Sequence, residues 1–162
     1  MKLSLFFIGL FILTSNLNIV EVRKNYKDAV TSQSKVDSFN ESLKNVTKND
    51  DKRLVAYKGA AIALAARYLK GAKQKSETFK SGVELVEFAI DKKPLDLEVR
   101  FVRLSIQQNS PKFLGYNKEI EGDKNYILTN YNTIRSKEFK KYLGSYILES
   151  GFFTEVEKSR LN

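Results

Sequence analysis

Three carboxylate side chains lie on one stripe of a helix predicted over residues 77–92. Glu84, Glu87 and Asp91 recur at helical spacing, so they face the same side of the helix. Carboxylates grouped in this way can bind a hard cation or share acid–base catalysis. Arg100 and Arg103 form a matching stripe on the next predicted helix, 96–108. The interpretation that needs no further partner is structural: Glu84 and Glu87 form ion pairs with Arg100 and Arg103 across the hairpin.

The arginine stripe also supplies candidates for ligand binding. A guanidinium presents a planar fork of donors that matches a carboxylate or a phosphate. Gln107 shares the stripe with Arg100 and Arg103, and Tyr116 follows in an aromatic loop. On a concave helical face these four side chains would bind the end of a peptide. Both alternatives, internal pairing and ligand contact, fit the residue types.

The composition excludes the commonest catalytic and metal-binding chemistry. The chain has no histidine and no cysteine, so it lacks the usual general base, the thiolate nucleophile and the main zinc ligands. It has no Gly-rich phosphate loop and no serine elbow motif. We therefore expect no metal, no cofactor and no enzymatic activity. The alternative is an enzyme outside the cytoplasm that works with carboxylate and arginine side chains.

The first 20 residues have the pattern of an export signal. Lys2 precedes an apolar run from Leu3 to Leu13, and polar residues follow at 14–16. A positive start, about 7–15 apolar residues and a polar end are typical of a secretory signal peptide. Apolar character continues to Val20, so an uncleaved membrane anchor is the alternative. We expect an exported protein, periplasmic or membrane-tethered, with residues 21–162 as its single domain.

The formal charge of +9 favours acidic partners. The lysines are scattered rather than gathered in blocks, which is typical of solvated helix faces. Because export separates the protein from nucleic acid, we expect no nucleic-acid partner. Membrane association through residues 3–13 or through the basic surface stays open, in the form of a tethered protein that binds anionic lipid.

Apolar residues recur with helical period along most of the chain. The predicted helices cover residues 21–31, 35–46, 51–70, 77–92, 96–108 and 118–134, a further helix after Ser136, and a tail over 152–161. Residues 49–51 and Ser136 are expected to begin and cap their helices. Residues 73–75 are expected to form a basic loop before Ser76 begins the next helix. The predicted fold class is therefore all-α, built of antiparallel helical hairpins.

The predicted helix 51–70 has a small, apolar centre. Residues 59–66 are apolar on nearly every side, which indicates a central helix that its neighbours approach closely. Leucine at Ala65 or Gly82 is therefore expected to destabilise the protein more than Glu84→Ala. The loop Phe-Leu-Gly-Tyr at 113–116 is interpreted as a cover for the core, with an exposed docking loop as the alternative.

Part of this region resembles a degenerate tetratricopeptide repeat. The signature positions are occupied by Leu64, Ala65, Tyr68, Gly82, Val86, Ala89 and Pro94. The spacer between Tyr68 and Gly82 is longer than in that repeat. Residues 79–116 are also similar to small exported helical proteins of flavobacterial type, which bring no established activity. The repeat resemblance implies a right-handed bundle or short solenoid, and with it a non-catalytic interaction or scaffold module that binds a protein or peptide partner.

Overall fold

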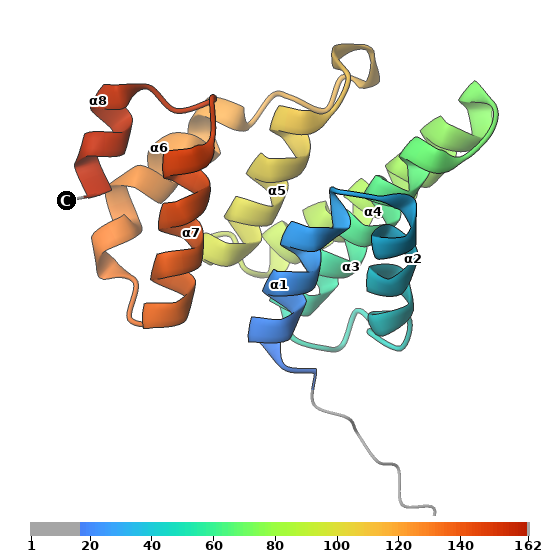
Figure 1. Cartoon of the computed structure of the whole chain (residues 1–162), viewed down its shortest axis with the longest axis horizontal. Coiled ribbons are helices and arrows are strands. Elements are labelled where there is room, and N and C mark those ends of the chain that lie inside the picture. Colours follow the sequence, from blue (N-terminus) through green and yellow to red (C-terminus); the bar gives the residue numbers. More distant parts are fainter. Residues whose placement is uncertain (1–16, 162) are drawn as a thin grey trace, which may run out of the picture.

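The computed structural model describes residues 17–161. Within this range the fold is all-α, without a strand, and successive helices pack antiparallel (Figure 1). The α-helices are α1 (Ile19–Ala29), α2 (Gln33–Ser42), α3 (Lys52–Ala65), α4 (Ala72–Lys92), α5 (Leu97–Asn109), α6 (Ile120–Asn130), α7 (Lys137–Glu149) and α8 (Glu155–Lys158). Most of the predicted signal or anchor segment, residues 1–16, lies outside the described residues, and α1 begins within its last residues. None of the described helices is long and apolar enough to cross a membrane.

Two of the predicted helix starts are confirmed by their caps. The Asp51 carboxylate accepts a hydrogen bond of 2.9 Å from the backbone N–H of Arg53. The Ser136 hydroxyl accepts one of 3.2 Å from the backbone N–H of Phe139. Each bond satisfies a donor that the first turn of the helix leaves free.

A third predicted start is wrong. Helix α4 begins at Ala72, so residues 73–75 form part of its first turns instead of a loop. The reversal takes place at Gly71, whose φ of 87° lies in the left-handed region that glycine adopts without strain. Lysine is a good helix former, and the basic residues therefore continue the helix toward Gly71.

Helices α3 and α4 pack more extensively than any other pair in the described part of the chain. Two glycines allow this approach. A Cβ atom on Gly82 would lie only 2.6 Å from the backbone N of Ala63 and 2.6 Å from the carbonyl oxygen of Gly59. Because α3 also contacts α1, α2 and α5, it is the central helix that the sequence predicts. Ala65, expected at the same contact, is only half-buried.

Three predicted helices end four or five residues earlier than expected. Helix α2 stops at Ser42, α3 at Ala65 and α6 at Asn130. After α3 and α6 the chain continues as a 3-10 turn, η1 (Ala66–Tyr68) and η3 (Tyr131–Thr133). The 3-10 turn η1 contains Tyr68, one of the tetratricopeptide-like positions. The described residues establish a set of antiparallel helices, and a repeat-like solenoid stays a prediction.

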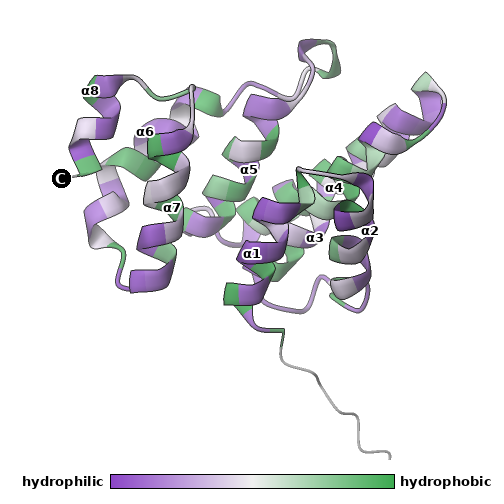
Figure 2. Ribbon diagram, viewed as in Figure 1, coloured by the Kyte–Doolittle hydropathy of each residue, from purple (hydrophilic) through white to green (hydrophobic). Residues whose placement is uncertain are grey.

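Apolar and polar residues alternate along the helices (Figure 2), and most of the buried residues are apolar. Compared with α3 and α4, helices α1 and α7 pack much less closely. These two helices lie next to each other (Figure 1) but touch over a short stretch only. A groove opens beside this contact, and residues of both helices line it.

Candidate functional site

Both predicted ligand-binding arginines are engaged in a buried ion cluster. Arg103 donates two hydrogen bonds to Asp123, from Nε at 2.7 Å and from Nη2 at 2.8 Å. Arg100 donates to the same carboxylate from Nη1 at 2.7 Å and to the carbonyl oxygen of Pro94 at 2.6 Å. The Asp123 side chain is 0% exposed. This geometry uses the planar fork of Arg103 within the protein.

Of the other predicted residues, Glu87 and Tyr116 join this cluster. Glu87 accepts a hydrogen bond of 3.1 Å from Arg103 and another from the Tyr116 hydroxyl. Burial, together with the bond to Glu87, raises the pKa of Tyr116. Gln107 is buried, and its Oε1 has no hydrogen-bond partner within the described residues. Glu84 is exposed and forms no ion pair among residues 17–161.

The structure therefore joins Arg100, Arg103 and Tyr116 in one cluster through Asp123 and Glu87. Gln107 lies one helical turn beyond Arg103 on α5. The main partner of the arginines is Asp123, which was not among the predicted site residues. A signal was present: Asp123 lies between Ile120 and Ile127 at helical spacing. An acid on the apolar side of a helix needs an internal partner.

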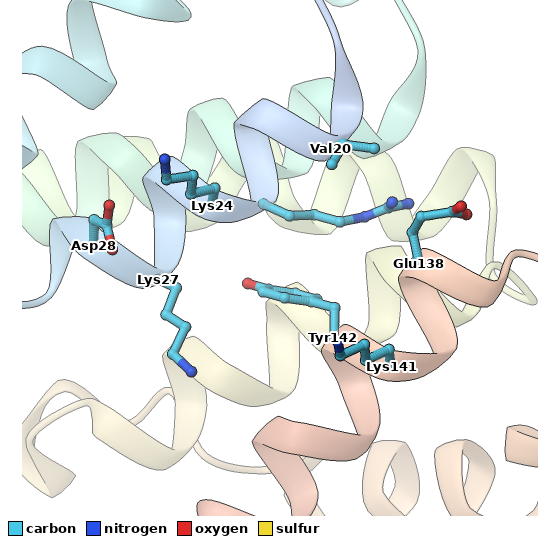
Figure 3. A pocket seen from close by; sticks show the side chains of 8 residues that line it. Val20, Lys24, Lys27, Asp28, Glu138, Lys141 and Tyr142 are labelled. Carbon is cyan, nitrogen blue, oxygen red and sulfur yellow. The ribbon is translucent and has the colours of Figure 1, made fainter.

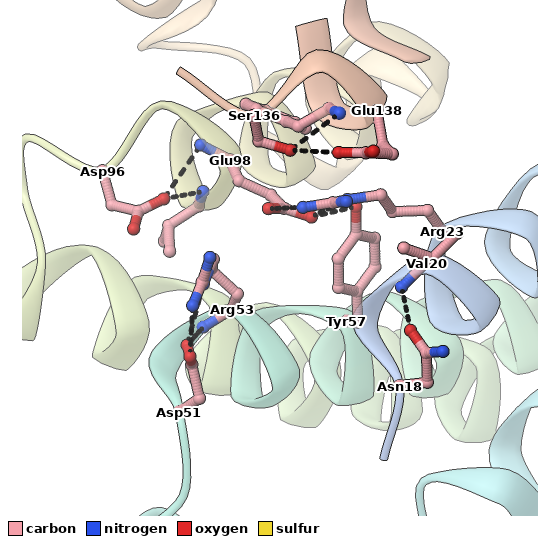
Figure 4. A network of polar contacts seen from close by, with 12 residues as sticks. Asn18, Val20, Arg23, Asp51, Arg53, Tyr57, Asp96, Glu98, Ser136 and Glu138 are labelled. Carbon is pink, nitrogen blue, oxygen red and sulfur yellow. Dashed lines mark hydrogen bonds and ion pairs between the residues drawn. The ribbon is translucent and has the colours of Figure 1, made fainter. Parts of the chain in front are cut away.

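A second buried ion pair, which was not predicted from the sequence, joins α1 to α5. Arg23 donates from Nε and Nη2 to the two carboxylate oxygens of Glu98, at 2.8 and 2.7 Å. The Tyr57 hydroxyl donates to Glu98 at 3.0 Å (Figure 4). Both charged side chains are almost fully buried. Every oxygen of Glu98 therefore has a donor, which is the condition for keeping such a pair inside a protein.

Buried tyrosines make the fold sensitive to alkali. Burial raises the pKa of Tyr26 to about 12, and burial followed by the charge of Glu98 raises the pKa of Tyr57. A phenol whose folded pKa exceeds its unfolded value of 10.0 stabilises the protein below that pH. We expect this stability to be lost as the pH rises from about 10 to about 12.

Parallel recordings of tyrosinate absorbance and helical circular dichroism check this expectation. Tyrosinate from the buried residues should form together with the loss of helix. Complete ionisation of the tyrosines while the helical signal is unchanged would contradict the burial of Tyr26 and Tyr57.

An apolar groove of about 960 Å³ opens between the helices. Parts of α1, α3, η1, α4, α5 and α7 line it, together with the 3-10 turn η2 (Lys112–Leu114). Its apolar walls include Leu64, Phe79, Phe101, Ile106, Leu114 and Tyr146. The groove can therefore bind apolar groups. Its volume is near the upper end of the roughly 300–1,000 Å³ typical of ligand pockets.

The polar atoms in the groove are largely bonded to one another. The Tyr26 and Ser105 hydroxyls share a hydrogen bond of 2.7 Å. The Tyr146 hydroxyl donates to Gln108 at 2.6 Å, and Asn109 donates to the Ser105 carbonyl oxygen at 2.8 Å. The floor thus offers apolar surface more than free hydrogen-bonding groups.

The rim of the groove is positively charged. Four cations line it, namely Lys27, Arg67, Lys75 and Lys141, against the single carboxylate of Glu138. Lys27 pairs with Glu149 at 3.2 Å, with both groups exposed. The other three cations form no ion pair within residues 17–161. They are available to an acidic partner.

A second pocket of about 490 Å³ continues along α1 and α7. Lys27, Glu138, Lys141 and Tyr142 line both openings. Figure 3 shows lysines from both helices around this pocket, with the Tyr142 ring between them. The positive rim therefore continues from the groove into the space between α1 and α7.

The aromatic loop at 113–116 has one exposed and two half-buried apolar side chains. Its interpretation as a core cover is wrong for Phe113, which is 85% exposed at the mouth of the groove. Leu114 and Tyr116 are half-buried, and the Tyr116 ring packs edge-on against Phe79 at 5.9 Å. Gly115, with a φ of 66°, makes the turn that separates these orientations.

The carboxylate that lines the groove, Glu138, is held in its ionised form. Hydrogen bonds from its own backbone N–H and from the Ser136 hydroxyl lower the pKa of Glu138, so this carboxylate is ionised near neutral pH. No group of three metal-ligating side chains occurs in the part of the chain that the structure describes. What the groove can do chemically is bind apolar and anionic groups.

Comparison with known proteins gives no match: no family model, no curated protein and no solved structure is significantly similar to the chain.

Proposed function

We propose that the protein is a non-catalytic binding module and that the apolar groove is its binding site. The observation that carries this proposal is the groove itself, about 960 Å³ with apolar walls and a cationic rim. A large apolar pocket is the usual place at which a protein binds its ligand. The ion cluster around Asp123 supports the same choice of site, because it engages Arg100 and Arg103 internally.

The proposed partner is a protein or peptide outside the cytoplasm. The α3–α4 hairpin, which carries the tetratricopeptide-like positions, forms one wall of the groove. Hairpins arranged around a concave surface are the way in which helical-repeat proteins present a binding face. A scaffold that holds a partner needs neither a cofactor nor a catalytic group, in keeping with the lack of histidine and cysteine.

A neutral apolar dye, N-phenyl-1-naphthylamine, tests whether the groove binds ligands at all. The full chain should show saturable dye fluorescence. In Ser145→Trp, the indole should fill part of the groove, because Ser145 is half-buried and lines it. We expect this change to weaken dye binding at least about tenfold, since new volume in a filled space costs roughly 1–3 kcal/mol.

The matched control is Ser81→Trp, because Ser81 is exposed on α4 and does not line the groove. It should bind the dye as the unchanged protein does, and thermal melts should show both variants folded. The absence of saturable binding to the unchanged protein would refute the proposed function. Equal affinities in the two variants would place the site elsewhere.

A further inference from the structure

We infer that the partner of the groove is an amphipathic helix that carries acidic residues on both sides of its apolar face. This inference rests on the proposed function of the groove and specifies the chemistry of its occupant. Three features of the groove support it in turn. No strand edge in the described range offers backbone groups to an extended peptide, the cations lie at two parts of the rim, and apolar residues extend to the mouth.

The occupant must satisfy its own backbone hydrogen bonds. The groove is lined by helical elements and short 3-10 turns, without a strand edge in the described range. The Tyr26, Ser105 and Tyr146 hydroxyls are bonded within the protein. An extended peptide would leave its amides unpaired over such a floor, which is costly. A helix pairs its own amides and can insert an apolar face into a groove.

The cations lie at two separate parts of the rim. Arg67 and Lys75 belong to the connection between α3 and α4, whereas Lys27 and Lys141 belong to α1 and α7. Figure 1 shows the α3–α4 connection and α7 on opposite sides of α1 and α5. A single acidic head group, as in a fatty acid, can approach one part of the rim at a time. A helix with acids along its flanks can approach both.

Apolar residues also extend beyond the groove to its mouth. Phe113 is 85% exposed and Val30 is 51% exposed, and both line the opening. A small ligand within the groove would leave these side chains in water. A helical peptide, roughly 10 Å across, can contact these side chains at the mouth while its own apolar side chains enter the groove.

Two synthetic peptides of about 18 residues, or five helical turns, test the inference by fluorescence anisotropy. They share one leucine face and differ in the flanks, which carry glutamate in one peptide and lysine in the other. The glutamate peptide should bind the full chain at least about tenfold more tightly at low salt, because several exposed attractions and repulsions of modest size add up. Added salt should reduce this preference.

Charge reversal at the rim supplies the second arm. The double variant Arg67→Glu/Lys75→Glu should lose most of the preference for the glutamate peptide. Lys35→Glu/Lys118→Glu is the control, because it changes the net charge equally at exposed lysines that do not line the groove. This control should keep the preference.

The outcomes separate the inference from the proposed function. Equal binding of the two peptides, or equal effects of the two double variants, would overturn the inference. Failure of both peptides while the neutral dye binds would also overturn it and leave the proposed function standing. Displacement of the dye by monomeric palmitate but not by the glutamate peptide would assign the groove to an anionic lipid instead. Failure of the dye to bind would refute the proposed function itself.

Discussion

Asp123→Asn is expected to lower the free energy of unfolding by about 3–5 kcal/mol, the usual cost of breaking a buried ion pair on one side. The Asp123 carboxylate accepts three hydrogen bonds from Arg100 and Arg103, at 2.7, 2.8 and 2.7 Å. Asparagine keeps the shape of the side chain but removes its charge. Its amide N–H₂ group would also face the N–H donors of the arginines, where the carboxylate oxygen accepts a hydrogen bond. Arg103 would be left buried with Glu87 as its one remaining charged partner.

Urea unfolding followed by circular dichroism measures this change. Glu84→Gln is the control, because Glu84 is exposed and should alter stability by no more than about 0.5 kcal/mol. Adding Arg103→Met to Asp123→Asn should recover part of the loss, since the second change removes the unpaired charge. A loss below about 1 kcal/mol for Asp123→Asn would mean that the cluster is open to solvent.

The second large effect is expected at the contact between α3 and α4, where Gly82→Leu should cost more than about 3 kcal/mol or prevent folding. Even a Cβ atom at this position would lie 2.6 Å from backbone atoms of Ala63 and Gly59. Backbone cannot move aside as a side chain does, so the two helices must separate. Gly82→Ala should therefore destabilise by about 1–3 kcal/mol, although alanine favours a helix over glycine by about 1 kcal/mol.

Gly122→Ala is the matched control for this test. A Cβ atom on Gly122 would meet only the Glu119 side chain, at 3.6 Å, so the substitution should stabilise the protein by about 0.4–1 kcal/mol. Thermal and urea unfolding of both alanine variants should give opposite signs. Stabilisation by Gly82→Ala would contradict the close approach of α3 and α4.

The helical elements could be predicted from the sequence because their signals are local. The periodicity of apolar residues predicts the helices, and Asp51 and Ser136 predict where α3 and α7 begin. The wrong start at Ser76 has a local cause too, because a run of lysines fits a loop or a helix equally well. Gly71 was the available signal, because glycine adopts the positive φ at which the chain reverses just before α4.

The site could be predicted only in part, because it depends on contacts between distant segments. The two stripes of Glu87 and Arg103 belong to neighbouring helices, and their pairing at 3.1 Å follows from a short hairpin. The pairing of Asp123 with Arg103 requires the position of α6 against α5. The groove requires the position of α7 beside α1, which are more than 100 residues apart in the chain, and no local pattern of residues specifies that spacing.

A nitrogen-15 chemical-shift titration of the full chain with the neutral dye tests the central claim most directly, because it shows where the ligand lies. Ring-current shifts should concentrate on amides that line the groove, such as Ala66, Ser105 and Ser145, while the Nε–H signal of Arg103 stays in place. Shifts centred on the side chains of Arg100 and Arg103, with the groove amides unchanged, would contradict it.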